Sequence, residues 1–83
     1  MNILITGGAG YIGSEMVGYF LDQGHKVHVV DNLLYGAESL LGYVGNKNFD
    51  FTKGDVRFAS SVDPLLGWAD VIIPLAALVG FPL

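Results

Sequence analysis

The hydrophobic residues of this chain recur with two different periods, and these periods predict a succession of strands and helices. Short apolar runs rich in β-branched residues predict strands at 2–6, 26–30 and 70–75, the last of them buried. A short third strand is predicted at 48–52. From Tyr11 to about Gln23 the apolar residues recur at helical spacing. This spacing predicts a helix with one buried stripe, formed by Ile12, Met16, Val17, Phe20 and Leu21.

Two further segments are predicted to form short helices. Residues 33–47 have apolar residues at helical spacing, although their glycines weaken this prediction. A helix over about 59–67 would begin with Ser60 or Ser61 as its N-cap and hold Pro64 in its first turn. In the first helix, Gly18 costs about 1 kcal/mol relative to alanine, so we expect another group to pack closely against it.

The alternation of strands and helices is typical of βαβ units and a parallel sheet. We therefore predict an α/β fold of the Rossmann type with strand order 3-2-1-4, which is half of a doubly wound sheet. Residues 1–83 would form one incomplete domain, because the complete sheet needs at least two more strands. An apolar fourth strand at the sheet edge exposes unpaired backbone groups, so we expect a homo-oligomer or self-association through this edge.

The composition narrows the class of protein and of partner. Of the 83 residues, 52% are hydrophobic and 14% are charged, which excludes intrinsic disorder. A net charge of −4 provides no basic surface for nucleic acid or an anionic membrane, and no apolar run is long enough for a membrane span. Cysteine is absent, and His25 and His28 flank the second strand with no third ligand in view. We therefore expect both to be surface or edge histidines, and we expect no metal site. A cytoplasmic location is expected.

The first strand is followed by Thr6-Gly7-Gly8-Ala9-Gly10-Tyr11-Ile12-Gly13-Ser14, a glycine-rich turn that leads into the first helix. Gly7 permits a sharp turn, Gly10 removes a Cβ that would block a phosphate, and Gly13 lets the helix pack closely on the strand. Free N–H groups at the helix N-terminus would bind a diphosphate. The context of strand, turn and helix is that of the dinucleotide-binding fingerprint. The alternative is a glycine-rich turn without a ligand.

Acidic residues follow the second and third predicted strands. A carboxylate at Asp31 can accept both hydroxyls of the adenosine ribose and would repel a 2′-phosphate, which favours NAD over NADP. Asp55 would face the exocyclic amine of adenine, and the N–H of Val56 a ring nitrogen. Alternatively, Asp31 starts a turn and Asp55 caps local backbone N–H groups. After the fourth strand, the small side chains that follow Leu75 would let the backbone approach the cofactor or would simply serve packing.

Four motifs together resemble the N-terminal part of an extended short-chain dehydrogenase/reductase of the NAD-dependent nucleotide-sugar epimerase/dehydratase family. They are TGGAGYIGS, Val30-Asp31-Asn32-Leu33, Gly54-Asp55-Val56-Arg57 and Leu75-Ala76-Ala77. The resemblance implies a tightly held NAD, a sugar linked to a nucleoside diphosphate as substrate, and chemistry that begins by oxidising a sugar hydroxyl. Phe58 and Pro74 depart from the family's usual acidic residue and histidine.

The resemblance also implies a role for each residue that matches the family's motifs. The pyrophosphate would lie against Gly7, Gly10, Tyr11, Ile12 and Gly13, the adenosine ribose against Asp31 and Asn32, adenine against Asp55 and Val56, and the rest of the cofactor against Leu75 and Ala76. We predict no catalytic residue, because the family's catalytic Tyr-x-x-x-Lys helix and its Ser/Thr partner have no recognised counterpart here. The chain would then be inactive alone. The alternatives are a stand-alone adenine-nucleotide or NAD-binding module without catalysis, and an inert α/β fragment.

Overall fold

The structure is a computed structural model that describes residues 1–7, 11–31, 38–54 and 59–75. Its elements follow in the order β1 (Asn2–Thr6), α1 (Tyr11–Asp22), β2 (Lys26–Asp31), the 3-10 helix η1 (Glu38–Tyr43), β3 (Phe49–Lys53), α2 (Ala59–Leu66) and β4 (Val71–Pro74). The predicted alternation is confirmed. Of the helices in these ranges, none has the length and apolar character needed to cross a membrane.

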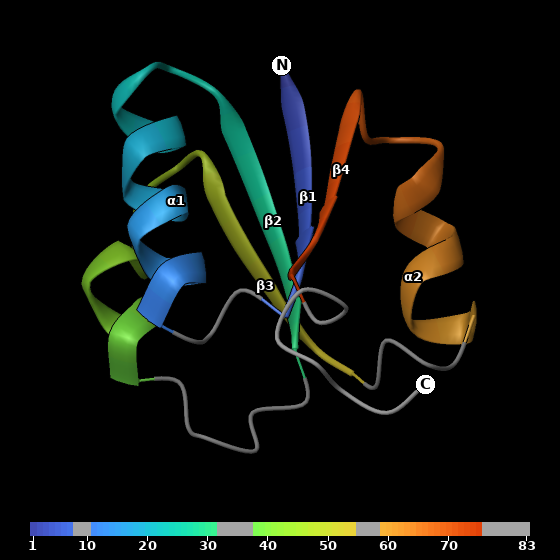
Figure 1. Cartoon of the computed structure of the whole chain (residues 1–83). Coiled ribbons are helices and arrows are strands. Elements are labelled where there is room, and N and C mark those ends of the chain that lie inside the picture. Colours follow the sequence, from blue (N-terminus) through green and yellow to red (C-terminus); the bar gives the residue numbers. More distant parts are fainter. Residues whose placement is uncertain (8–10, 32–37, 55–58, 76–83) are drawn as a thin grey trace.

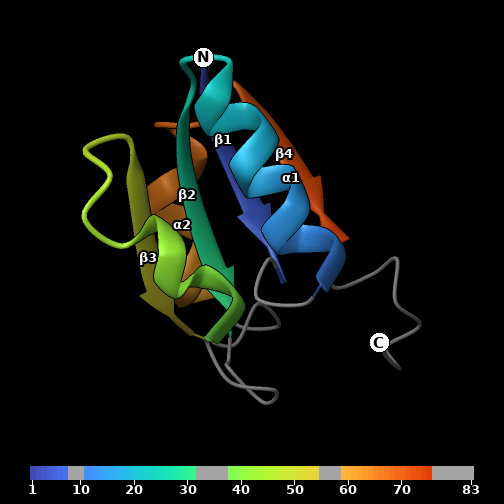
Figure 2. The same cartoon turned by 90° about the vertical axis from the view of Figure 1, so that its left-hand side faces the viewer.

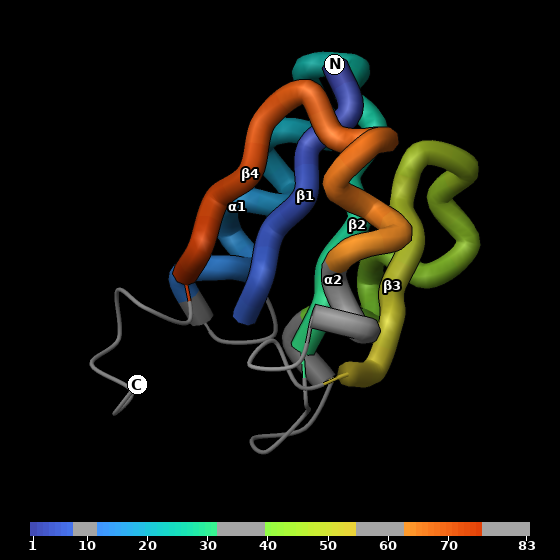
Figure 3. The backbone as a smooth tube through the Cα atoms, turned by 90° about the vertical axis from the view of Figure 1, so that its right-hand side faces the viewer, coloured from blue at the N-terminus to red at the C-terminus, as the bar shows by residue number. Residues whose placement is uncertain are grey.

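The four strands form one parallel sheet in the order β3-β2-β1-β4, as predicted. Helices cover both faces of the sheet: α1 and η1 lie on one face and α2 lies on the other (Figures 1, 2 and 3). The chain runs outward from β1 through β2 to β3 and then returns to the other side of β1. The boundary between β1 and β4 is therefore the point at which the strand order reverses.

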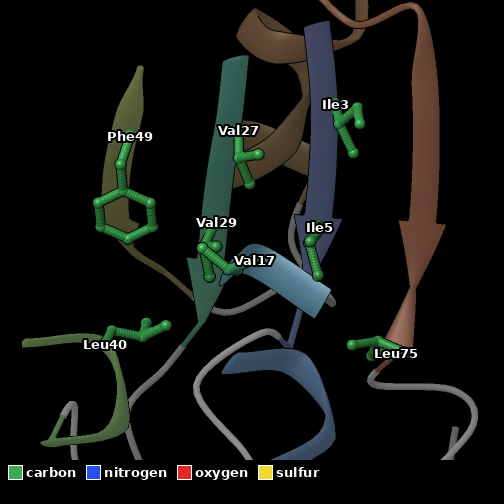
Figure 4. Close-up of a cluster of buried hydrophobic side chains, with 8 residues drawn as sticks. All are labelled: Ile3, Ile5, Val17, Val27, Val29, Leu40, Phe49 and Leu75. Atoms are coloured by element: carbon green, nitrogen blue, oxygen red, sulfur yellow. The ribbon is translucent and has the colours of Figure 1, made fainter. Parts of the chain in front are cut away.

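In the part of the chain that the structure describes, the cluster of buried hydrophobic residues lies between the sheet and α1. Alternate residues of the central strands point toward this helix because successive side chains of a strand face opposite sides. Figure 4 shows them together with one residue each from α1, η1 and β3 and with the residue that follows β4; the cluster consists of Ile3, Ile5, Val17, Val27, Val29, Leu40, Phe49 and Leu75. The sheet is thus buried through its two inner strands, as the composition predicts for a parallel sheet.

One member of the predicted helical stripe lies outside the core. Val17 is fully buried and Met16, Phe20 and Leu21 are partly buried against the cluster, whereas Ile12 is 61% exposed. At about 100° per residue, Ile12 is about 140° around the helix axis from Val17 and therefore faces away from the sheet. The prediction of a buried Ile12 is wrong, because it counted apolar residues without fixing which direction faces the sheet.

Gly18 has the close neighbour that the sequence analysis expected. A Cβ at this position would lie 2.5 Å from the Tyr43 hydroxyl oxygen and 3.3 Å from Cζ of the same ring. Tyr43 ends η1 and its hydroxyl donates a hydrogen bond to the carbonyl of Ser14 in α1, at 2.8 Å. The prediction of a short helix within 33–47 is confirmed for this 3-10 helix.

Three details of the second half differ from the prediction. β3 begins at Phe49, one residue later than expected, and α2 begins at Ala59, so neither predicted serine is the N-cap and Pro64 lies beyond the first turn. β4 was expected to be buried, yet Val71 is 36% and Ile72 is 46% exposed. Within the described ranges β4 pairs with β1 alone, so no strand covers its outer side.

Candidate functional site

The ends of β1, β2 and β3 bring the predicted site residues to one edge of the sheet. Thr6 of β1 is paired with Val30 of β2, so the next residues, Gly7 and Asp31, follow on neighbouring strands at the same level. Asp31 is in turn paired with Lys53 of β3. Because all strands are parallel, this is the carboxyl edge, where open α/β sheets bind their ligands. The lower part of Figure 1 shows this edge, with the beginning of α1 beside it.

Gly7 makes the turn that the sequence predicted. Its φ of 83° lies in the left-handed region, which an L-residue with a Cβ rarely adopts. Its N–H donates a hydrogen bond of 2.8 Å to the carbonyl of Val30, so the turn is fixed to β2 before the chain leaves the sheet. A side chain at this position would therefore strain the backbone and disturb the junction between β1 and β2.

The beginning of α1 provides the second part of the site. The helix starts at Tyr11, and Gly13 is buried, in agreement with the role of close packing assigned to it. No acidic residue lies in the first turn, so this turn itself supplies no carboxylate against the positive end of the helix dipole. Ile12 is exposed on this turn, and Gly10 and the Tyr11 side chain lie outside the described part of the chain. A helix start of this kind favours an anionic ligand.

Asp31 provides the third part, as the last residue of β2. Its backbone carbonyl accepts the N–H of Gly54 at 3.0 Å, which holds the exit of β3 beside the end of β2. The residues assigned to adenine follow Gly54 directly in the sequence. Asn32, Asp55, Val56 and Ala76 all fall outside the described residues, so their roles remain predictions. The structure brings together Gly7, the start of α1 and Asp31.

Leu75 follows β4 at the same edge, where it is 5% exposed and belongs to the core cluster. Figure 4 shows its side chain directed into the core. The contribution of Leu75 to a cofactor site would therefore come through its backbone.

The chain also contains a Tyr-x-x-x-Lys spacing, at Tyr43 and Lys47, that the sequence analysis overlooked. In an α-helix such a pair shares one face. Here η1 ends at Tyr43 and Lys47 lies exposed in the following turn, so no helix joins the two residues. The Tyr43 hydroxyl is bonded to Ser14 and its ring packs on Phe49, with ring centroids 5.9 Å apart. This tyrosine therefore has a structural environment, and it does not share a helix face with Lys47.

A polar cluster on the opposite face of the sheet was not predicted either. His28, expected at the surface or edge, lies within β2 with its Nε2 2.6 Å from the hydroxyl of Thr52 on β3 and its ring edge-on to Trp68. Burial lowers the pKa of His28, and the carboxylate of Asp50 opposes that shift. The alternation of side chains along the strand could have indicated this, because His28 faces opposite to Val27 and Val29. The cluster lies on the α2 side, away from α1 and the candidate site.

Residues 3–83 match the family of NAD dependent epimerases and dehydratases. The chain belongs to this family. This match confirms the resemblance stated from the four sequence motifs. The predicted fold class and strand order are confirmed by the sheet of this chain and by its similarity to solved structures.

Known proteins resemble the chain in sequence or in structure. A low-salt glycan biosynthesis protein of Haloferax volcanii is 44% identical over 80 residues, which are 93% of this chain and 26% of that protein. A dTDP-glucose 4,6-dehydratase of Bacillus anthracis in complex with NAD has a TM-score of 0.79 and 32% identity, over 89% of this chain and 26% of its own. A UDP-glucose 4-epimerase of Thermotoga maritima with UDP-glucose has a TM-score of 0.74 and 34% identity, over 89% and 23%. The chain thus spans about a quarter of each of these relatives.

Proposed function

We propose that this chain binds NAD through the adenosine diphosphate half of the cofactor, as the N-terminal cofactor-binding segment of a nucleotide-sugar epimerase or dehydratase. The observation that supports this most is the placement of Gly7, the start of α1 and Asp31 at one carboxyl edge. These groups offer a tight turn, backbone N–H donors and a carboxylate, which suit a pyrophosphate and a ribose. Gly10, Asn32, Asp55, Val56 and Ala76 extend the proposed site by their place in the sequence.

In the complete enzyme, NAD held at this edge would supply the transient oxidation of a sugar hydroxyl to a ketone. The hydride would come from the carbon that carries the hydroxyl and would return after epimerisation or elimination, while the hydroxyl proton would pass to a base of the complete enzyme. The contribution of this chain is to bind and orient the cofactor. Gly7 and the first turn of α1 would hold the diphosphate, while Asp31 would accept hydrogen bonds from both ribose hydroxyls. The same carboxylate would repel the 2′-phosphate of NADP, so the proposed preference is for NAD. The substrate would be a sugar linked to a nucleoside diphosphate, as in the named relatives.

Titration calorimetry with NAD and NADP tests the proposed role of Asp31. Asp31→Ala removes two charge-assisted hydrogen bonds, each worth about 1.5–3 kcal/mol before solvent exposure reduces the value. We expect the Kd for NAD to rise and the ratio of the Kd for NADP to the Kd for NAD to move closer to one. Asp63→Ala is the matched control, because it removes the same charge from an exposed position on α2. An unchanged NAD/NADP ratio in Asp31→Ala would refute the role in ribose binding.

We also propose that the 83-residue chain has no turnover of its own. Support comes from the environment of Tyr43, which leaves the Tyr-x-x-x-Lys spacing without a catalytic geometry. Epimerase or dehydratase turnover of a nucleotide sugar by the purified chain would contradict this part of the proposal. The cytoplasmic location expected from the sequence stays a prediction.

Self-association through the edge of β4 completes the proposal. It is supported by the exposure of Val71 and Ile72 on a strand that pairs on one side only within the described ranges. An apolar strand edge of this kind is a template for pairing with a second chain. Sedimentation velocity at rising concentration would test it, and a single monomeric species throughout would refute it.

A further inference from the structure

Tyr43 connects three elements through one side chain. It is the last residue of η1, its hydroxyl donates to the Ser14 carbonyl at 2.8 Å, and its ring packs at 5.9 Å against Phe49 of β3. Ser14 is itself buried, and it is the fourth residue of α1, so the bond is made within the first turn of the helix. Tyr43 therefore links this first turn to η1 and to the sheet.

Gly18 makes the link possible. In an α-helix the Ser14 carbonyl already accepts the N–H of Gly18, four residues later. A side chain at position 18 would cover the flank of that carbonyl, since its Cβ would lie 2.5 Å from the Tyr43 hydroxyl oxygen. The missing Cβ leaves room for a second donor. This explains why a residue that weakens helices stands in the middle of α1.

The hydrogen bond between Tyr43 and Ser14 fixes the position of α1 along its own axis, which the apolar core leaves free. Contacts such as that of Val17 with the sheet are non-directional, so they hold α1 against the strands but resist sliding along the helix axis only weakly. A hydrogen bond has a preferred length and direction. Its acceptor, the Ser14 carbonyl, belongs to the first turn of α1. The bond therefore fixes the position of this first turn along the helix axis relative to Gly7 and Asp31.

We infer that Tyr43 is a positioning residue for the dinucleotide site: its hydrogen bond to Ser14, made across Gly18, holds the first turn of α1 where the diphosphate binds. This inference rests on the proposed function. Chains with the first turn out of place do not present their N–H groups to the diphosphate. The apparent dissociation constant then rises in inverse proportion to the competent fraction.

The test compares Tyr43→Phe with the matched control Tyr19→Phe. Both variants lose one hydroxyl, but Tyr19 is 62% exposed and its ring meets only the neighbouring Phe20 among the ring pairs described. ADP is titrated at a low temperature at which circular dichroism shows every variant folded. We expect the Kd for ADP to rise about threefold to tenfold in Tyr43→Phe, with the free energy of one hydrogen bond as the upper limit. Tyr19→Phe should match the unsubstituted chain.

Amide hydrogen exchange of the ligand-free chain separates positioning from a general loss of stability. In Tyr43→Phe we expect faster exchange than in the unsubstituted chain at Gly18, whose N–H is bonded to Ser14. Protection at Leu4 in the centre of the sheet should be the same in both. Equal loss of protection at both residues and an unchanged Kd for ADP would overturn the inference and leave Tyr43 a purely structural residue. If the unsubstituted chain failed to bind ADP, the proposed function would fail together with the inference. Normal binding by that chain with an unchanged Kd in Tyr43→Phe would overturn the inference alone.

Discussion

Replacing Gly18 with alanine should destabilise this chain, although the same change stabilises most helices. In an ordinary helix interior, glycine to alanine gains about 1 kcal/mol. Here the new Cβ would stand 2.5 Å from the Tyr43 hydroxyl oxygen and 3.3 Å from Cζ. Tyr43 is part-buried between α1 and Phe49 and is hydrogen-bonded to Ser14, so it cannot move aside without losing a contact.

Three contributions determine the change in the free energy of unfolding caused by Gly18→Ala. Overpacking against a held ring costs about 1–3 kcal/mol, and the displaced hydroxyl loses a hydrogen bond worth about 0.5–1.5 kcal/mol. The gain in helix propensity of about 1 kcal/mol offsets part of this cost. A net loss of about 0.5–3.5 kcal/mol remains. For a domain of this size each kcal/mol shifts the melting temperature by about 4–8 °C.

Gly42→Ala is the matched control, because this glycine of η1 has nothing within 4 Å of the position of a new Cβ and has no positive φ. It should be neutral or raise stability by about 0.4–1 kcal/mol. Urea melts of both variants give the comparison. Gly18→Ala should also cost less in a Tyr43→Phe background, where the nearest contact is gone. Equal stabilisation by Gly18→Ala and Gly42→Ala would refute the close packing of Tyr43 on α1.

Two further predictions concern the other face and the edge of the sheet. Because burial lowers the pKa of His28, the unfolded chain binds more protons than the folded chain below the ordinary histidine pKa of about 6.5, so stability should fall as the pH drops from about 7 to 5.5. His28→Gln should flatten the pH dependence of the unfolding free energy measured by urea melts over this range, whereas a retained slope in His28→Gln would rule out this histidine as its source. At the edge, Ile72→Lys places a charge on β4 and should shift the chain toward monomer in sedimentation. Persistent association of that variant would place the contact elsewhere.

The sequence predicted those features that depend on local pattern and on glycine chemistry. The four strands, their order, the helix from Tyr11 and the turn at Gly7 all follow from periodicity, from right-handed connections and from the freedom of glycine at positive φ. The expectation of a close neighbour at Gly18 also followed from the sequence, because a glycine inside a helix lowers the stability of that helix. Its identity did not, because Tyr43 comes from an element distant in the sequence.

The predictions that were wrong concern burial and contacts that depend on residues from other elements of the fold. Ile12 is apolar and regularly spaced, but the direction of the sheet relative to α1 leaves it exposed. The apolar sequence of β4 predicted burial, which needs a covering layer that the pattern itself cannot supply. His28 was expected at the surface or edge, because its contact with Thr52 depends on the pairing of β2 with β3. Sequence reasoning thus located the edge of the site through Gly7 and Asp31 but missed the contacts that hold it in place.

The claim that this chain recognises the adenosine diphosphate half of NAD is tested most directly by thermal melts with three ligands. ADP and NAD should stabilise the chain to a similar extent, and nicotinamide mononucleotide hardly at all, because Gly7, the start of α1 and Asp31 serve pyrophosphate and adenosine ribose. At about 100 times the Kd the gain is about 2.7 kcal/mol, which corresponds to about 10–20 °C for a domain of this size. Strong stabilisation by NAD with none by ADP would contradict the placement of the cofactor on this edge. The absence of an effect from all three would show that the edge binds no dinucleotide.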